Sequence, residues 1–262
     1  MPIRSRILRL EVDLVKNSEL LDSLLRMDPL KKPSYICFAN VHMLIEAYRD
    51  ASVRKAVNSS TLTLTDGMPL VMALRFLYGI KQERITGMDF MPALMKEAEI
   101  KGESVFLFGA TIEILDKIES RAILDYPELK IAGKISPPFG KLFDKDIVDH
   151  VRIINDSKAK YVFVSLGCPK QELWMAGNSP RINAILLGVG GAFEVYAGTK
   201  KRAPEWMRKY SLEWFYRLIQ EPARLIKRYL VTNSYFVILL AIQYLQIKFF
   251  GIFKIKSRSD LD

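Results

Sequence analysis

The chain has 262 residues, of which 50% are hydrophobic and 26% are charged, a composition that excludes a disordered chain and is typical of a folded domain with a full apolar core. The net charge is +10, but residues 1–195 carry only +2 and residues 196–262 carry +8. Two distant cysteines make neither a disulfide framework nor a zinc cluster, and charges interrupt the apolar residues of the N-terminus, unlike a secretory signal. We therefore expect a cytoplasmic protein.

The first 195 residues alternate short apolar, β-branched runs with longer amphipathic segments. The short runs predict six strands, at Tyr35–Ala39, Leu62–Thr65, Val105–Phe108, Lys130–Ile135, Tyr161–Leu166 and Ala184–Gly188. The longer segments predict helices at His42–Val57, Pro69–Leu77, Phe90–Lys101, Ile112–Leu124, Lys145–Asn155 and Gln171–Met175. Apolar strands that alternate with helices indicate an α/β fold, with a Rossmann-like, mostly parallel sheet and helices on both of its faces.

Glycines and polar residues gather where the predicted strands end. In sheets of this kind, ligands bind beyond the carboxyl ends of the strands. The residues at or just after those ends include Asn40, Asp66, Gly109, Lys170, Gln171, Gly190 and Gly191. We expect the binding site to lie among them.

Asp66 ends an apolar run and precedes a glycine, so its carboxylate is placed just beyond a strand. There it can act as a general base if burial raises its pKa, or it can cap the helix that begins near Pro69. Another polar segment, Arg84–Phe90, follows. In it Asp89 is expected to cap a helix, and Arg84 can pair with either a phosphate or a carboxylate.

One short acidic motif, Asp144-Lys145-Asp146, matches the DxD pattern that can hold a divalent cation. It opens a helical segment, however, where acidic residues favour the N-terminus of a helix. Both histidines of the chain, His42 and His150, are too isolated to complete a metal site with it. We predict no metal and no cofactor.

The run Gly188–Phe193 is similar to part of a dinucleotide-binding fingerprint, but it follows the last predicted strand instead of an early one. A nicotinamide-dependent dehydrogenase is therefore the weaker hypothesis. The stronger one is that Gly190 and Gly191 let the backbone approach a nucleotide closely.

Residues 196–230 predict a helical appendage, broken near Pro222, in which Trp and Tyr residues alternate with cations. A segment of this kind is expected to meet a polyanion, which can be an anionic lipid surface, a pyrophosphate or a nucleic acid. Stacking of its aromatic residues on bases would suit a nucleic-acid-binding protein. The apolar run that follows fits a lipid better.

That run, Tyr235–Ile242, is only eight residues long before Gln243, Gln246 and Lys248 interrupt it. A membrane-spanning helix needs about 20 predominantly apolar residues. We therefore expect residues 231–262 to associate with a membrane by lying in its interface. Burial in the core or in an interface between copies of the chain, which would make it a homo-oligomer, is the alternative.

Several blocks together carry a resemblance to a known family: LTDGMPLV, RITGMDF, VFLFGA, VSLGCPKQELWM, GVGGAFEVYAG, and RAPEW followed by LEWFYRLIQEPARLIKRYL. In this order, over about residues 10–230, they resemble the WecG/TagA/CpsF family of bacterial glycosyltransferases. The resemblance implies residues 1–195 as an α/β catalytic domain with the family's own Rossmann-like fold. Residues 196–230 would be a basic appendage that completes the active site, and residues 231–262 a membrane-associating tail.

The resemblance also implies an activity. It would be an inverting, metal-independent transfer of N-acetylmannosamine or another hexose from a UDP-sugar to an undecaprenyl-diphosphate-linked sugar, in the synthesis of a cell-surface polysaccharide or teichoic acid. Such an enzyme would work peripherally at the inner face of the cell membrane, on an anionic surface, and not on a nucleic acid.

Carried over by position, the resemblance makes Asp66 the catalytic base and makes Arg217 and Arg224 the cations that hold the diphosphate. The substrate-binding residues would be Asn40, Arg84, Gln171, Lys170, Gly109, Gly190, Gly191 and Glu194. Without a metal, a departing diphosphate needs cations and helix N-termini, and arginine suits phosphate best.

Two positions depart from the family pattern. Phe38 stands where the family usually has Thr, and Glu194 stands where it usually has Asp. Both departures point to a changed sugar specificity. Phe38 also keeps open the hypothesis of a non-catalytic relative that serves as an accessory subunit of a polysaccharide glycosyltransferase.

Overall fold

A parallel six-stranded sheet forms the centre of the protein in the computed structural model, which describes residues 3–138, 140 and 144–250. The strands are arranged in the order β4-β3-β8-β7-β5-β6, and every neighbouring pair is parallel. Their bounds are β3 Ser34–Ala39, β4 Leu62–Thr65, β5 Ser104–Gly109, β6 Lys130–Ile135, β7 Tyr161–Ser165 and β8 Ile185–Gly188. The predicted α/β fold with a parallel sheet is confirmed.

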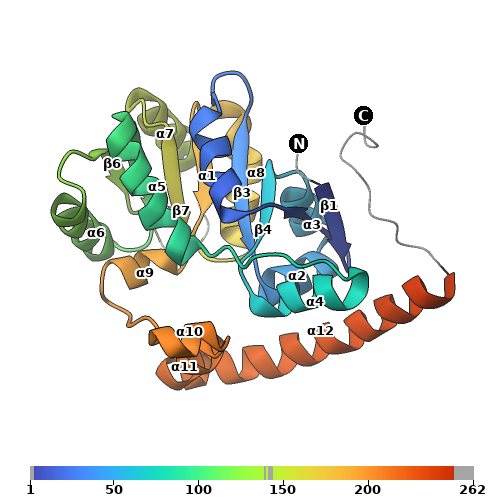
Figure 1. Cartoon of the computed structure of the whole chain (residues 1–262). Helices are drawn as coiled ribbons and strands as arrows, with labels where there is room; N and C mark the ends of the chain where they lie inside the picture. The colour runs from blue at the N-terminus through green and yellow to red at the C-terminus, as the bar shows by residue number, and fades with distance from the viewer. Residues whose placement is uncertain (1–2, 139, 141–143, 251–262) are drawn as a thin grey trace.

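Helices cover both faces of this sheet, as predicted (Figure 1). One face packs against α1 Asn17–Arg26, α5 Gly87–Lys101, α6 Ile112–Asp125 and α9 Ala192–Tyr196. The other packs against α2 Val41–Arg49, α3 Ala51–Asn58, α4 Met68–Tyr78, α7 Asp144–Asp156 and α8 Lys170–Asn178, which leads into the short 3₁₀ helix η1 Ser179–Arg181. Within β3, Tyr35 and Cys37 face this second layer while Ile36 and Phe38 face the first, so the strand is buried on both sides.

Several local features differ from the sequence prediction, which did not include α1 or α9. The helix predicted over His42–Val57 is two helices, because Asp50 leaves the helical conformation and its side chain accepts hydrogen bonds from the Ser52 and Val53 N–H groups at the start of α3. An N-terminal hairpin was also not predicted. It consists of β1 Ile3–Ile7 and β2 Leu10–Leu14, and it packs beside β4.

The C-terminal part is entirely helical, with α10 Glu205–Lys209, α11 Glu213–Gln220 and α12 Pro222–Phe250. The predicted break near Pro222 separates α11 from α12. The predicted boundary at residue 230 falls inside α12, which runs without interruption along α2 and α4 (Figure 1).

Gln243 fastens the far half of α12 to the N-terminal hairpin. Its Oε1 accepts the Leu8 N–H at 2.7 Å, and its Nε2 donates to the Arg6 carbonyl at 3.0 Å and to the Tyr78 hydroxyl at 3.2 Å. The Tyr244 ring beside it stacks on Phe76 of α4, with 4.5 Å between the ring centroids. The glutamine that interrupts the apolar run in the sequence therefore points into the protein and leaves the outer face of the helix apolar.

We expect Gln243→Ala to loosen this half of α12, because the buried Leu8 N–H loses its acceptor at a cost of about 1–3 kcal/mol. Hydrogen exchange should then speed up in α12 while the sheet amides stay protected. Gln246→Ala is the matched control, since Gln246 is exposed on the same helix. Equal exchange in α12 of the two variants would contradict the role of Gln243.

Candidate active site

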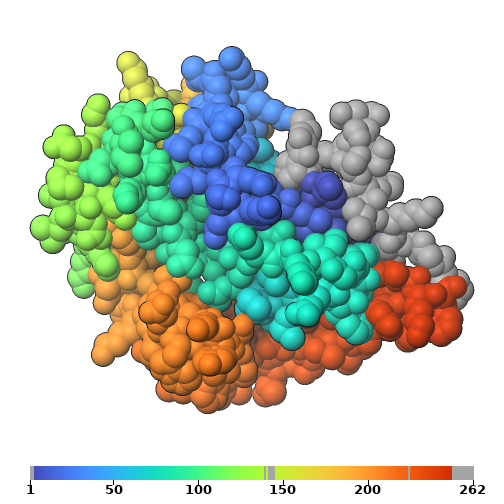
Figure 2. Space-filling view, in the orientation of Figure 1, coloured from blue at the N-terminus to red at the C-terminus, as the bar shows by residue number. Residues whose placement is uncertain are grey.

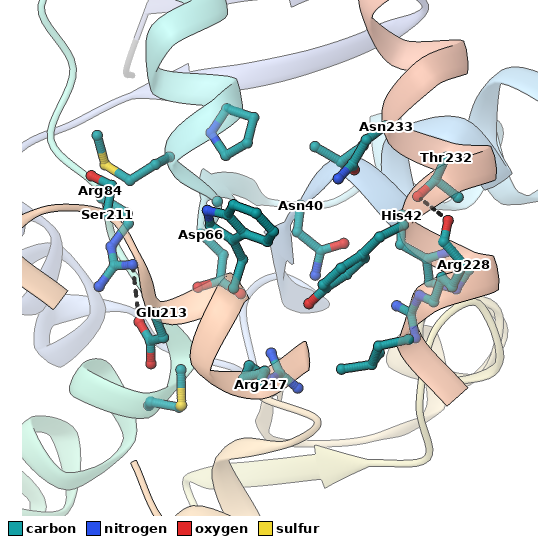
Figure 3. Close-up of a pocket in the computed structure, with 18 residues that line it drawn as sticks. Asn40, His42, Asp66, Arg84, Ser211, Glu213, Arg217, Arg228, Thr232 and Asn233 are labelled. Atoms are coloured by element: carbon teal, nitrogen blue, oxygen red, sulfur yellow. Dashed lines mark hydrogen bonds and ion pairs between the residues drawn. The ribbon is translucent and has the colours of Figure 1, made fainter. Parts of the chain in front are cut away.

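A cavity of about 240 Å³ lies at the carboxyl ends of β3 and β4, between the sheet and the C-terminal helices (Figure 3). The residues before position 100 that line it are Asn40, Val41, His42, Asp66, Gly67, Met68, Pro69, Arg84 and Met88. The remaining lining residues come from the C-terminal helices or the turn before α11: Ser211, Glu213, Trp214, Arg217, Leu225, Arg228, Tyr229, Thr232 and Asn233. The cavity therefore has one wall from each part of the chain.

Two neighbouring strand ends hold Asn40 and Asp66 together. The Asp66 N–H donates to the Ala39 carbonyl at 2.9 Å, which links the end of β4 to the end of β3. Asn40 caps α2, because its Oδ1 accepts the Met43 N–H at 3.1 Å. The N-cap of α4 is Gly67 and has no side-chain cap. The carboxylate of Asp66 is therefore not used as a helix cap and faces the cavity.

Burial raises the pKa of Asp66 to about 7, although the positive charges of Arg217 and Arg84 oppose the rise. A carboxyl group with this pKa is partly ionised near neutral pH and can accept a proton there. Figure 3 shows it between Asn40 on one side and the pair formed by Arg84 and Glu213 on the other, with Arg217 nearby. This is the arrangement of a general base beside a cationic group.

Arg84 pairs with a carboxylate and thereby joins the two walls. Its Nη1 donates to Glu213 at 3.0 Å, and both side chains are largely buried. Arg202, which lies 3.8 Å from the other oxygen of Glu213, also donates to Asp89 at 2.6 Å. The predicted N-cap role of Asp89 is wrong, because Thr86 caps α5 by accepting the Asp89 N–H. The carboxylate of Asp89 instead accepts hydrogen bonds from the Thr86 hydroxyl and from Arg202.

Arg217, on α11, lines the cavity opposite Asp66. Its guanidinium forms no hydrogen bond or ion pair with another residue of the described ranges, and it lies within 3.5 Å of the point where a side chain on Gly191 would begin. A free arginine beside a glycine turn can receive an anionic ligand. Arg224 belongs to the first turns of α12, but its side chain lies outside the described part of the structure.

Gln171 lies just behind the glycine turn, at the start of α8. Its Nε2 donates to the Gly188 carbonyl at 3.0 Å and to Glu172 at 2.7 Å, and a side chain on Gly190 would begin 3.4 Å from its Oε1. Glu172 is fully buried, and burial raises its pKa to about 7 although the bond from Gln171 opposes this. Gln171 supports the turn and does not line the cavity.

Apart from Gln171, five predicted binding residues do not line the cavity: Gly109, Lys170, Glu194, Gly190 and Gly191. Gly109 has a positive φ, and a side chain there would begin 2.2 Å from the Ser165 carbonyl oxygen, so the packing of β5 against β7 already requires a glycine. Lys170 is exposed at the start of α8. Glu194 pairs with Lys200 at 2.6 Å and thereby anchors the segment that leads to the C-terminal helices.

Phe38, which departs from the family pattern, belongs to β3; its side chain is buried on one face of the sheet and contacts Phe90 with 5.8 Å between the ring centroids. It belongs to the apolar layer that contains α5 and does not line the cavity. Its bulk therefore leaves the cavity open.

Sequence reasoning missed most of the second wall and several residues of the first, His42 among them. Burial lowers the pKa of His42 to about 4, with Arg228 acting in the same direction, so this imidazole is neutral at pH 7. Leu225, Arg228, Tyr229 and Thr232 follow one another at helical spacing along α12. This spacing was a usable signal, because it places polar residues on the face opposite the exposed apolar one.

No group of three or more His, Cys, Asp or Glu side chains suited to a metal ion occurs in the described ranges. Asp144 and Asp146 lie in the first turn of α7, as their interpretation as helix-terminal residues expects, and the side chain of Asp144 is outside the described part. Metal independence stays a prediction.

The chain is similar in sequence to known proteins. The model of the glycosyl transferase WecG/TagA/CpsF family matches residues 5–249. A protein of Bacillus subtilis (strain 168) is 35% identical over 190 residues, 72% of each chain, and one of Staphylococcus aureus (strain MW2) is 31% identical over 192 residues, 73% of this chain and 74% of the relative. Both relatives are named N-acetylglucosaminyldiphosphoundecaprenol N-acetyl-beta-D-mannosaminyltransferase.

The raised pKa of Asp66 predicts a cost in stability. The folded protein holds the Asp66 proton more tightly than the unfolded chain does. Protonated Asp66 therefore contributes its full share to the free energy of unfolding below pH 3.8, and this contribution is lost as the pH rises through about 7. We expect Asp66→Asn to raise the melting temperature by about 3 °C or more at pH 8 and to change it little below pH 4.

Asp89→Asn is the control of opposite sign. Burial acts to raise the pKa of Asp89, but hydrogen bonds from Thr86 and Arg202 outweigh it and hold that pKa below its usual value. Ionised Asp89 therefore stabilises the folded protein above pH 3.8, and this stabilisation is lost as the pH falls. The Asp89→Asn variant should melt at a lower temperature than the wild type at pH 8. An Asp66→Asn protein that melts like the wild type at pH 8 would refute the assigned burial of the carboxylate.

Proposed function

Because the chain belongs to the WecG/TagA/CpsF family of glycosyl transferases, we propose that it transfers N-acetylmannosamine or a related hexose from a UDP-sugar to a lipid-diphosphate-linked sugar. The relatives' name gives the acceptor class, an N-acetylglucosamine on diphosphoundecaprenol. The observation that carries the proposal is the cavity in which Asp66, with a pKa near 7, and Arg217 meet. A polymer of the cell surface, such as a teichoic acid, would be the product that this reaction serves.

The chemistry is a single displacement. Asp66 takes the proton of the acceptor hydroxyl, that oxygen forms a bond to the anomeric carbon of the donor sugar, and the bond from that carbon to UDP breaks. Because attack and departure occur on opposite sides of the carbon, the configuration inverts. Asp66 must be ionised to accept the proton, so kcat/KM should rise with pH through about 7.

The leaving UDP gains negative charge, and the cavity offers it a cation. Arg217 lies beside Gly191, where the backbone can come close to a phosphate because no side chain intervenes. A positioned donor of this kind contributes most when charge develops in the transition state. We assign Arg217 to the diphosphate on this ground, and assign Arg224 to it by family resemblance alone.

The outer face of α12 supports a peripheral membrane location. Residues Leu225–Phe249 are long and apolar enough, by length and composition, to cross a membrane, with a mean hydropathy of 1.5 and only 17% of the most apolar stretch buried. The eight-residue apolar run counted in the sequence understates this surface, because Gln243 points inward. Leu230, Val237 and Ile238 are each more than half exposed.

The inner face of α12 argues for a helix that lies in the interface. Phe236 and Gln243 are buried against the body of the protein, so lipid cannot surround the helix while it is docked. Met72 of α4 is 63% exposed, and Figure 2 shows α4 directly above α12 along the lower edge of the molecule. With Lys227 and Lys248 toward the two ends, this surface suits an anionic bilayer.

The function is tested with the full-length protein, a panel of UDP-sugars and a short-chain lipid-diphosphate N-acetylglucosamine, with products identified by mass spectrometry. One donor should add a single sugar to the acceptor, also in excess EDTA, and Asp66→Asn should lower the rate roughly 10²–10⁴-fold. The absence of transfer from every donor would refute the function. Loss on chelation, restored by Mn²⁺ or Mg²⁺, would refute metal independence alone.

The membrane surface is tested by co-sedimentation with vesicles that contain phosphatidylglycerol. Met72→Glu and Val237→Glu should each weaken binding about tenfold, because each puts a charge into the apolar contact. Leu124→Glu on α6 is the matched control, since Leu124 is 81% exposed but lies away from this face. Membrane-bound protein that resists carbonate extraction would instead indicate a spanning α12.

A further inference from the structure

The two walls of the cavity differ in chemistry. The wall formed by the ends of β3 and β4 carries the base and the amide of Asn40, whereas the C-terminal helices contribute two aromatic side chains, Trp214 and Tyr229. The aromatic pair is preorganised, with an edge-to-face contact of 6.2 Å between the ring centroids. One side of the cavity is therefore lined by two aromatic rings set at 70° to each other, and the other side carries a carboxylate.

The structure separates the aromatic residues of the basic segment into two groups. Trp206, on α10, is 57% exposed and does not line the cavity. Trp214, on α11, is 49% exposed and lines it. Membrane anchoring would explain Trp206 but does not explain why Trp214 and Tyr229 meet inside the cavity.

A polar group stands beside this aromatic pair. Asn233 is exposed and lines the cavity one helical turn after Tyr229, and its amide makes no hydrogen bond within the described ranges. Neighbouring Thr232 donates instead to the Arg228 carbonyl at 2.8 Å. A free amide next to an aromatic surface suits a ring that has an apolar face and one polar substituent.

We propose that Trp214, Tyr229 and Asn233 form the subsite for the acceptor's sugar, a deduction that rests on the proposed function. The C–H groups of the pyranose contact the two rings, the amide of Asn233 bonds to the acetamido group, and a ring hydroxyl is directed at Asp66. Trp214 and Tyr229 then determine acceptor recognition and have no part in holding the donor.

Two observations favour the acceptor over the donor for this wall. The cation and the glycine turn suited to the donor's diphosphate, Arg217 and Gly191, adjoin a second, smaller cavity that neither Trp214 nor Tyr229 lines. The wall with the aromatic pair is also continuous with α12, whose outer face is the proposed membrane surface. A sugar carried on a membrane lipid reaches this wall first.

The test uses the full-length protein, a soluble short-chain acceptor and no vesicles, so that membrane anchoring plays no part. Trp214→Ala and Tyr229→Ala should each raise the acceptor KM about tenfold, while the Kd of UDP, measured calorimetrically, stays within about twofold of wild type. Trp214→Phe should recover part of the loss, and Trp206→Ala is the matched control with unchanged kinetics. Asn233→Ala should remove the preference for an acetamido acceptor over a glucosyl one.

Each outcome has one meaning. Weaker UDP binding with an unchanged acceptor KM would overturn the proposal and assign the aromatic pair to the donor. Unchanged kinetics in Trp214→Ala, in an assay where the wild type transfers sugar, would also overturn it. Failure of the wild type itself to transfer sugar would refute the proposed function instead, and normal UDP binding shows that a variant is folded.

Discussion

The cavity depends on the buried ionic contact between Arg84 and Glu213. These side chains are 19% and 8% exposed, and they come from the segment before α5 and from the first residue of α11. Removing one partner of such a pair leaves a buried charge, at a cost of about 3–5 kcal/mol. Arg202, held between Glu213 and Asp89, extends the contact. Charged groups thus fix where the C-terminal helices meet the sheet, which apolar packing alone would leave free to slide.

The second attachment of α12, through Gln243, lies about 18 residues beyond Leu225, or roughly 27 Å along the helix. A helix held at two such distant points has little freedom to rotate. Its inner face therefore stays toward the cavity and the hairpin, and its apolar face stays outward. Because its orientation is fixed, the same helix forms a wall of the cavity on one side and the proposed surface for lipid on the other.

The sequence was sufficient for the six strands, because apolar parallel strands produce an unambiguous pattern between amphipathic segments. It was insufficient where polar groups are buried. Arg4 and Asp13 form an ion pair inside the N-terminal hairpin, which hides the alternation of its apolar residues. The same limitation applied to Gln243, whose inward direction depends on three partners far away in the chain.

The site was partly predictable for a related reason. Asn40 and Asp66 follow strands whose ends must converge, so chain order and the topology rule were enough to bring them together, whereas Arg84 follows α4 and was assigned to the site by resemblance. Arg217 was found by resemblance to a family. Trp214, Tyr229 and Asn233 needed the structure, because a helical segment rich in aromatic residues looks the same whether it faces lipid or a cavity.

The placement of Asp66 has an energetic consequence for the whole arrangement. Burial that raises its pKa makes the ionised form unfavourable in the folded protein at neutral pH, and that form is the one that can act as a base. Arg217 and Arg84 reduce this cost, but Arg84 is already shared with Glu213. Since Arg217 stands on α11, undocking that helix would remove both the counter-charge and the aromatic wall. Docking of the C-terminal helices is therefore the step on which the proposed base, the proposed diphosphate cation and the proposed acceptor subsite all depend.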